Sequence, residues 1–319
     1  MHFAGIPAHT SPSGMLVHFG TTALDAVTTG GQNTAVGYNA LTANTTGTNN
    51  IATGIDALAA NTTGRQNVAV GFYALKNNTT AQGNTAVGNN AMNSNTTGLF
   101  NTSLGWSSLS SNTTGNFNLA TGPESLRFNT TGGSNTASGG ASLYKNSTGS
   151  YNTASGYSAL FYNTTGDSNT ASGYYSLRLN TTGSKNTTLG YQAGDVLTTG
   201  SNNLILGSDS DPSSATASNQ IVLGYSATGK GDNTVTLGNE GVTAVYAAED
   251  GDAVIYAGGL NLDGVTISAN ATELSYVDGV TSAIQTQLDG KQDALTAGSG
   301  ITISSGTISA GITSGSISD

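Results

Sequence analysis

The sequence repeats every 17 residues, and this period restricts the possible folds more than any other feature of the chain. One column of glycines keeps the register without an insertion or deletion; it comprises Gly20, Gly37, Gly54, Gly71, Gly88, Gly105, Gly122, Gly139, Gly156, Gly173, Gly190, Gly207 and Gly224. A constant period of this kind predicts a stack of like units, each of which packs only on its two neighbours.

The composition of one unit predicts a β-solenoid. Seventeen residues are too few for a strand and a crossover helix, and the frequent Gly and Asn disfavour a helix. We expect short strands at "TAVG" and "NAL", with corners at "NTTG" and at the glycine after the first strand, where Gly and Asn tolerate positive φ. The expected fold is therefore all-β: a repetitive parallel β-solenoid, or β-roll, with its 17-residue coils about 4.8 Å apart.

Few side chains in each unit can form a core. One apolar column runs through Leu24, Leu41, Leu58, Leu75, Met92, Leu109, Leu126, Leu143, Leu160 and Leu177, and only small apolar residues accompany it. One coil can hardly offset the conformational entropy of ordering 17 residues with so little apolar area. We therefore expect the leucine or valine columns to face partner chains, in a homotrimer that buries equivalent columns around one axis.

The register changes in the second half of the chain, where the glycine spacing falls to 14 between Gly224 and Gly238. We expect an N-terminal docking segment (1–19), solenoid repeats (20–240), a β-rich connector (241–268), a short coiled coil (269–295) and a β-rich tip or stalk (296–319). The expected coiled-coil seam comprises Leu274, Val277, Ile284, Leu288 and Leu295. β-Branched residues at one seam position with Leu at the other favour two strands, which counts against a trimer.

Composition excludes several classes of function. The chain has no cysteine, so it forms no disulfide or thiolate metal site, and its formal charge of -10 argues against nucleic-acid binding. Neither a run of about 18 apolar residues nor a Sec-type signal is visible, so we expect no membrane insertion. The rod carboxylates do not pair closely, so they form no glycosidase pair; they are Asp25, Asp56, Glu124, Asp167 and Asp195. We expect no catalytic residue, cofactor or metal site.

Two groups of residues invite a sharper interpretation. The acidic turns around Asp209 and Asp211, and around Glu249, Asp250 and Asp252, could gather calcium ligands, but solvated turns are the favoured interpretation because no complete ligand set is visible. An aromatic column follows the repeat glycine: Tyr38, Phe72, Trp106, Tyr157, Tyr174, Tyr191 and Tyr225. These rings could stack on glycans, although cross-strand stacking accounts for them without a ligand and is favoured.

The repeats also resemble those of a known family. The "NTAVGYNALTANTTG" units resemble repeats in fibre-like proteins of marine bacteriophages, particularly cyanophages, and more distantly the YadA-like β-roll heads of trimeric autotransporter adhesins. The segment "ATELSYVDGVTSAIQTQLDGKQDALTAGSGITIS" resembles a linker near the carboxyl end of phage fibre proteins. Together these stretches cover residues 20–319. The absence of a visible signal peptide and membrane anchor departs from the autotransporter pattern.

The phage resemblance implies a homotrimeric virion appendage, namely a tail fibre, a spike or a capsid-attached horn. Such a protein would lie on the particle surface, dock on other virion proteins through one terminus and serve attachment to the host, with a surface glycan as a possible ligand. Two alternatives stay open. One is an ice-binding or other surface-binding solenoid that uses the Thr pairs of "NTTG", such as Thr45 and Thr46. The other is a polysaccharide-degrading spike whose site forms between chains.

Overall fold

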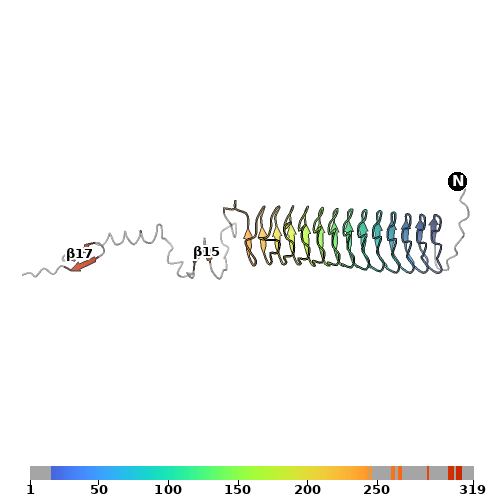
Figure 1. Ribbon diagram of the computed structural model, residues 1–319, viewed down its shortest axis with the longest axis horizontal. Helices are drawn as coiled ribbons and strands as arrows, with labels where there is room; N and C mark the ends of the chain where they lie inside the picture. The colour runs from blue at the N-terminus through green and yellow to red at the C-terminus, as the bar shows by residue number, and fades with distance from the viewer. Residues whose placement is uncertain are drawn as a thin grey trace, which may run out of the picture. The chain divides into compact units, whose positions relative to one another are not determined.

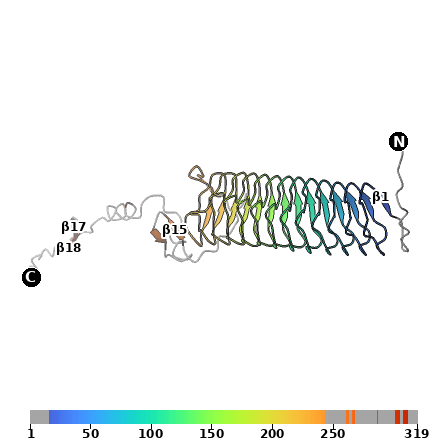
Figure 2. The ribbon, with the colours of Figure 1, turned by 45° about the vertical axis from the view of Figure 1, so that its right-hand side comes forward.

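The structure, a computed structural model, describes residues 16–243 and 245, together with 260–262, 265–267, 286, 301–304 and 307–310. The chain divides into two compact units, Met1–Ala244 and Val245–Asp319. The first unit contains the solenoid, in which each coil contributes one short strand to a single row (Figures 1 and 2). The all-β, repetitive solenoid expected from the 17-residue period is confirmed.

Fourteen strands form one parallel sheet in sequence order. They are β1 (Val17–Phe19), β2 (Thr34–Val36), β3 (Ile51–Thr53), β4 (Val68–Val70), β5 (Thr85–Val87), β6 (Thr102–Leu104), β7 (Leu119–Thr121), β8 (Thr136–Ser138), β9 (Thr153–Ser155), β10 (Thr170–Ser172), β11 (Thr187–Leu189), β12 (Leu204–Leu206), β13 (Ile221–Leu223) and β14 (Val235–Leu237). Each residue pairs with the residue 17 positions later, as Thr34 does with Ile51. The last step is shorter, because Ile221 pairs with Val235.

The second strand that the sequence predicted in each coil, at "NAL", is absent. This stretch is a turn in which Asn39 and Leu41 both adopt positive φ, at 55° and 52°. Left-handed residues alternating with right-handed ones cannot form an extended strand. Hydrogen bonds between coils nevertheless continue through the turn, since the Leu41 N–H donates to the Ala57 carbonyl at 3.0 Å.

The two glycine columns meet different requirements. Gly37 has a φ of 135°, and a Cβ there would lie 2.5 Å from the Gly54 carbonyl oxygen of the next coil. Gly47, at the "NTTG" corner, does not adopt positive φ, contrary to the sequence prediction. A Cβ at Gly47 would lie 2.3 Å from Asn44 Oδ1 and 2.4 Å from the Gly64 carbonyl oxygen. The corner glycine is therefore required by the close approach of neighbouring coils.

The leucine column lies inside the solenoid, where every member from Leu24 to Leu177 has no exposed surface. Alanines at the strand centres, such as Ala35, and before the leucines, such as Ala40, complete this core. Of the leucine and valine columns that were expected to face partner chains, the leucine column is therefore excluded, because each chain buries it as its own core. Gly194 interrupts the column, and the larger buried side chains of Leu197 and Ile205 occupy the interior near this point.

Two buried asparagine columns connect the coils. In the first, Asn50 donates its N–H and its Nδ2 to Asn33 Oδ1, at 2.9 and 3.2 Å, and its Nδ2 also donates to the Gly64 carbonyl at 2.9 Å. In the second, Asn61 Nδ2 donates to Asn44 Oδ1 at 2.8 Å. Amide ladders of this kind satisfy buried polar groups coil after coil.

The second unit is described only in short stretches. β15 (Leu260–Leu262) pairs antiparallel with β16 (Val265–Ile267), and β17 (Ile301–Ser304) pairs antiparallel with β18 (Thr307–Ala310). The predicted coiled-coil seam, Leu274, Val277, Ile284, Leu288 and Leu295, lies outside the described residues. Within the described part of the chain, the structure contains no helix that is long and apolar enough to cross a membrane.

Candidate functional site

All seven members of the predicted aromatic column are exposed, from 40% for Phe72 to 67% for Tyr225. Only three of them stack on one another: the ring centroids of Tyr157 and Tyr174 lie 5.6 Å apart, and those of Tyr174 and Tyr191 lie 5.5 Å apart. Non-aromatic residues separate the other four; at this register they are Ile55, Asn89, Pro123, Gly140 and Ser208. The column thus contains one stack of three rings and four rings without an aromatic neighbour in the column; one of these four, Phe72, stacks on Tyr73.

The three stacked tyrosines turn their faces mainly toward one another. The planes of Tyr174 and Tyr191 differ by 6°, and those of Tyr157 and Tyr174 by 18°. A hydrogen bond with Tyr175, followed by burial, raises the pKa of the Tyr174 phenol. Rings that cover one another leave little face for a sugar, so this stack fits the structural role that the sequence analysis favoured.

A set of cations beside the aromatic column was missed by the sequence analysis. Lys76, Arg127 and Arg178 share one register and recur every third coil. Lys76 Nζ lies 4.0 Å from the centre of the Tyr73 ring, and Arg178 Cζ lies 4.4 Å from that of Tyr175. The 51-residue spacing of these three cations was visible in the sequence and could have revealed the set.

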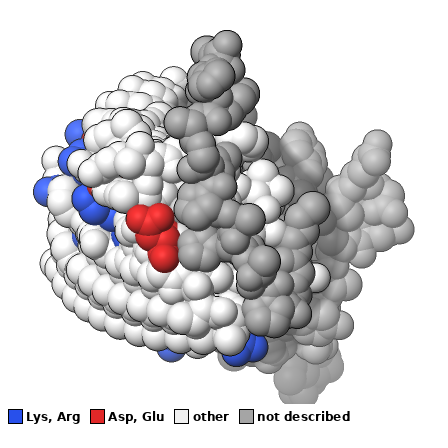
Figure 3. All heavy atoms as spheres, turned by 90° about the vertical axis from the view of Figure 1, so that its right-hand side faces the viewer, with Lys and Arg blue, Asp and Glu red and all other residues white. Residues whose placement is uncertain are grey.

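These cations lie against rings and acids. Arg127 Nη1 contacts Glu124 Oε1, and Lys76 Nζ lies 3.1 Å from Asp56 Oδ2. In the end-on view, most visible Lys and Arg atoms gather on one side of the solenoid (Figure 3). The charges of Lys76 and Arg127 are partly neutralised by these acids, and the charged groups of all three cations lie over aromatic rings.

A hollow opens on this same side of the solenoid. It measures about 230 Å³ and is lined by Asn90, Asn93, Ser94, Ser107, Ser110, Ser111 and Arg127. Apart from Arg127, its lining residues are small polar residues of two consecutive coils. Arg127 also lies 5.8 Å from the ring centre of Trp106, whose side chain is 50% exposed.

The outward face of the sheet has a different composition. The first and third residues of each strand point outward from β1 to β14, and these 28 positions carry 16 apolar residues, 12 Thr or Ser, and no charged residue. The apolar residues form two zones, β1–β7 and β11–β14, on either side of the hydroxyl-bearing strands β8–β10. Leu104, Leu189 and Leu237 on this face are 41%, 54% and 49% exposed. An uncharged apolar surface this long is unusual for the exterior of a single chain.

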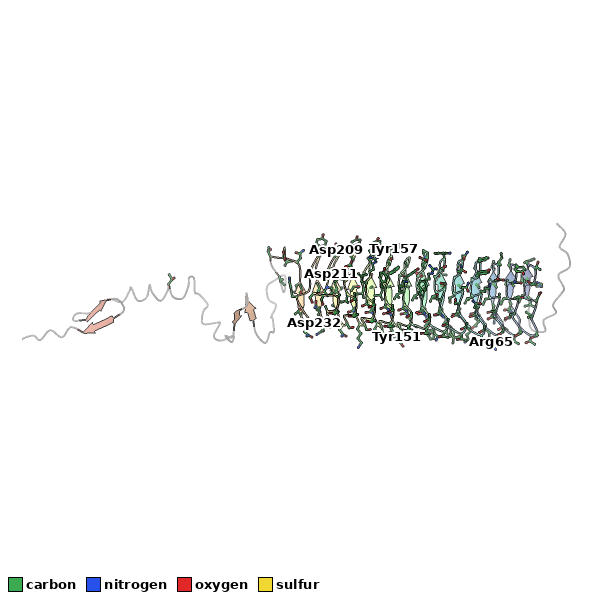
Figure 4. The ribbon with its side chains drawn as sticks, viewed as in Figure 1. Arg65, Tyr151, Tyr157, Asp209, Asp211 and Asp232 are labelled. Carbon is green, nitrogen blue, oxygen red and sulfur yellow. The ribbon has the colours of Figure 1, made fainter. Side chains whose placement is uncertain are left out.

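The acidic turn lies at the interruption of the leucine column. Asp211 occupies the leucine register one coil after Gly194, and its Oδ1 is buried without a hydrogen-bond partner. Burial, with the nearby Asp195 carboxylate, raises the Asp211 pKa to about 6. Figure 4 shows Asp209 and Tyr157 along one edge of the solenoid and Arg65 and Tyr151 along the opposite edge. Among the described residues, no group of three or more His, Cys, Asp or Glu could hold a metal ion.

The threonine pairs of "NTTG" divide into two roles. The first hydroxyl is engaged between coils, since Thr45 Oγ1 donates to the Thr62 carbonyl at 3.1 Å, and Thr62 Oγ1 does the same to Thr79. The second threonine is exposed; this column includes Thr46, Thr63, Thr80, Thr97, Thr114, Thr131, Thr148, Thr165, Thr182, Thr199 and Thr216. The array on the surface is therefore one column wide.

The comparisons with known proteins do not assign the chain to a group. The sequence matches no family model and no curated protein.

Proposed function

We propose that the chain forms a homotrimeric rod that serves as a structural appendage of a phage virion, such as a tail fibre, a spike or a capsid-attached horn, and takes part in host attachment. The observation that carries this proposal is the uncharged outward face of the 14-stranded sheet. Its 13 steps of about 4.8 Å make it roughly 62 Å long. A second and a third copy would supply matching apolar zones at β1–β7 and β11–β14, with the hydroxyl-bearing strands β8–β10 between them.

Exposure favours this face over the leucine column. The leucines are already buried, whereas Val70, Val87 and Leu104 present side chains that are 37%, 39% and 41% exposed in neighbouring strands. Burying such side chains stabilises an assembly by roughly 25 cal/mol per Å² of apolar area. The sequence resemblance supports the phage assignment, and the long uncharged face supports the assembly.

The test of assembly is the mass of the purified protein in solution, by light scattering together with sedimentation velocity. Three copies of the 31.7 kDa chain give about 95 kDa with the high frictional ratio of a rod. Val87→Glu places a carboxylate on the sheet face and should yield monomers, whereas Thr114→Glu, on an exposed corner, should leave the trimer intact. A wild-type monomer, or equal behaviour of the two variants, contradicts assembly through the sheet face.

The virion role has its own test. Mass spectrometry of purified particles of the phage that encodes this chain should detect its peptides in a stoichiometric multiple of three. Their absence from the particles would refute the appendage role without affecting the assembly.

One observation favours a second candidate. The exposed threonine column repeats once per coil along the solenoid, a regularity that suits binding to an ice surface. The engagement of the first threonine hydroxyls limits that array to a single column. Freezing-point hysteresis measures this activity directly, and its presence together with a monomeric mass would favour this candidate over the fibre.

A further inference from the structure

We infer that the hollow beside Trp106 is a binding site for a neutral pyranose ring. This inference deepens the proposed attachment role, on which its biological meaning rests, and it concerns a different face from the sheet. The hollow is defined by its lining residues, Asn90, Asn93, Ser94, Ser107, Ser110, Ser111 and Arg127.

The hollow exists because two consecutive coils carry short side chains where their neighbours carry long ones. Tyr73 and Lys76 precede it at the same registers, and Arg127 and Phe128 follow it. The pair before it packs with Lys76 Nζ 4.0 Å from the Tyr73 ring centre, and in the pair after it Arg127 Cζ lies 5.3 Å from the Phe128 ring centre. Cation–aromatic pairs therefore occupy these registers in the coils on either side of the depression, and Arg127 of the second pair lines it.

Several polar groups in the hollow remain available to a ligand. Asn93 Nδ2 donates to Asn90 Oδ1 at 3.1 Å, which orients both amides and leaves Asn90 Nδ2 without a partner among the described residues. The hydroxyls of Ser94, Ser107 and Ser111 likewise make no side-chain hydrogen bond within the described chain. The hydroxyls of the partly exposed Ser94 and Ser111 and one amide donor match the alternating donors and acceptors of a sugar ring, whereas Ser107 is 5% exposed.

Trp106 lies next to the lining residues and is the apolar group that a ligand in the hollow would reach. It directly precedes Ser107, its side chain is half exposed, and its ring centre lies 5.8 Å from Cζ of Arg127, which lines the hollow. Unlike the three stacked tyrosines, Trp106 has Asn89 and Pro123 at its own register in the two neighbouring coils. Its ring is therefore not covered by a column neighbour, and an indole presents a broad apolar face with one polar N–H.

The charges around the hollow favour a neutral ligand. The only cation that lines it, Arg127, contacts Glu124 Oε1, and the other lining residues are uncharged. A carboxylate-bearing sugar would gain little from a guanidinium that is already paired, and it would lie close to Glu124. A single ring in a shallow site should bind with a dissociation constant on the order of 1 mM.

Trp106 is the only tryptophan of the chain, so its emission reports on this site directly. The full-length protein is titrated with methyl α-D-glucopyranoside, methyl α-D-mannopyranoside, methyl β-D-galactopyranoside and N-acetylglucosamine, and in parallel with glucuronic acid and N-acetylneuraminic acid. The expected result is a saturable change in emission with at least one neutral sugar, with the heat of binding measured by calorimetry as an independent readout.

Ser111→Phe tests the location. Phe128 stands at the same register one coil later, so the fold accepts a phenyl group there while the hollow is filled. We expect at least a tenfold loss of affinity. Ala60→Phe makes the same addition at the same register three coils earlier and should leave binding unchanged.

Three outcomes would overturn the inference: no saturable signal with any neutral sugar, a response only to the two acidic sugars, or undiminished affinity in Ser111→Phe. The trimer measurement keeps these results separate from the proposed function. A trimeric rod without sugar binding removes the site and leaves the appendage, whereas sugar binding by a monomer keeps the site and removes the trimeric rod.

Discussion

Removal of one side-chain amide from the middle of the first asparagine ladder should strongly destabilise the solenoid, because several hydrogen bonds are lost at once. The Asn118 Nδ2 donates to Asn101 Oδ1 at 3.1 Å and to the Gly132 carbonyl at 2.9 Å. Its Oδ1 accepts the N–H and the Nδ2 of Asn135, at 3.0 and 3.1 Å. Asn118→Ala deletes these four hydrogen bonds at a site with 2% exposure. At about 1 kcal/mol each, we expect a loss of about 4 kcal/mol in the free energy of unfolding.

A second asparagine of the same ladder provides an internal comparison for this loss of stability. Asn84 makes only three such bonds, because its Nδ2 reaches the Gly98 carbonyl but not the preceding Asn67. Asn84→Ala should therefore cost about 3 kcal/mol. Thr114→Ala, at an exposed corner, should stay within about 0.5 kcal/mol of the wild type.

Urea denaturation at one fixed protein concentration, followed by Trp106 emission and by circular dichroism, measures all three variants. Trp106 is in the coil before Asn118 in the ladder and reports on its surroundings. A loss below about 1 kcal/mol for Asn118→Ala, indistinguishable from Thr114→Ala, would refute the view that amide ladders hold the coils together.

Two further substitutions test the glycine column and the acidic turn. Gly122→Ala should lower the free energy of unfolding by about 2 kcal/mol or more, because φ is 119° and a Cβ would lie 2.7 Å from the Gly139 carbonyl carbon. Gly133→Ala is the control, since the nearest atom to a Cβ there is 3.1 Å away. Equal urea midpoints for the two variants would contradict this prediction. The raised Asp211 pKa makes the folded chain bind a proton more tightly than the unfolded chain, so this contribution to stability is complete below pH 3.8 and is lost as the pH rises through about 6. Urea midpoints at pH 4 and pH 7 should therefore differ more for the wild type than for Asp211→Asn, and an equal difference would refute the assignment.

The architecture could be predicted from the sequence because each 17-residue repeat forms one coil of the stack. A column such as the one through Asn33 and Asn50 can be read without knowing the path of the chain, since equivalent residues of neighbouring coils lie in contact. The path within one coil was harder to predict. Leu41 at positive φ contradicts ordinary local preference, and only the burial of its side chain in the interior accounts for it.

The candidate site was predicted only in part. Trp106 was singled out as one of seven aromatic residues. The hollow beside it arises because several neighbouring columns carry short side chains in the same two adjacent coils, and no single column shows this. The choice between the leucine and the valine column as the inward-facing one could not be made from the sequence for a related reason. Counting apolar residues per coil cannot tell which of two columns points inward, whereas the structure places Leu41 inside and Val70 outside.

The end of the asparagine ladder bears on the length of the solenoid. Gln220 takes the register of Asn203 and donates its N–H to Asn203 Oδ1 at 3.0 Å, but its side chain turns aside to Ser213 and Asp232. The amide ladder therefore ends at Gln220, and the last coil, which carries β14, pairs with β13 without it. The number of 17-residue repeats therefore determines the length of the solenoid. Each duplication or deletion of one repeat before Gln220 would lengthen or shorten the solenoid by about 4.8 Å.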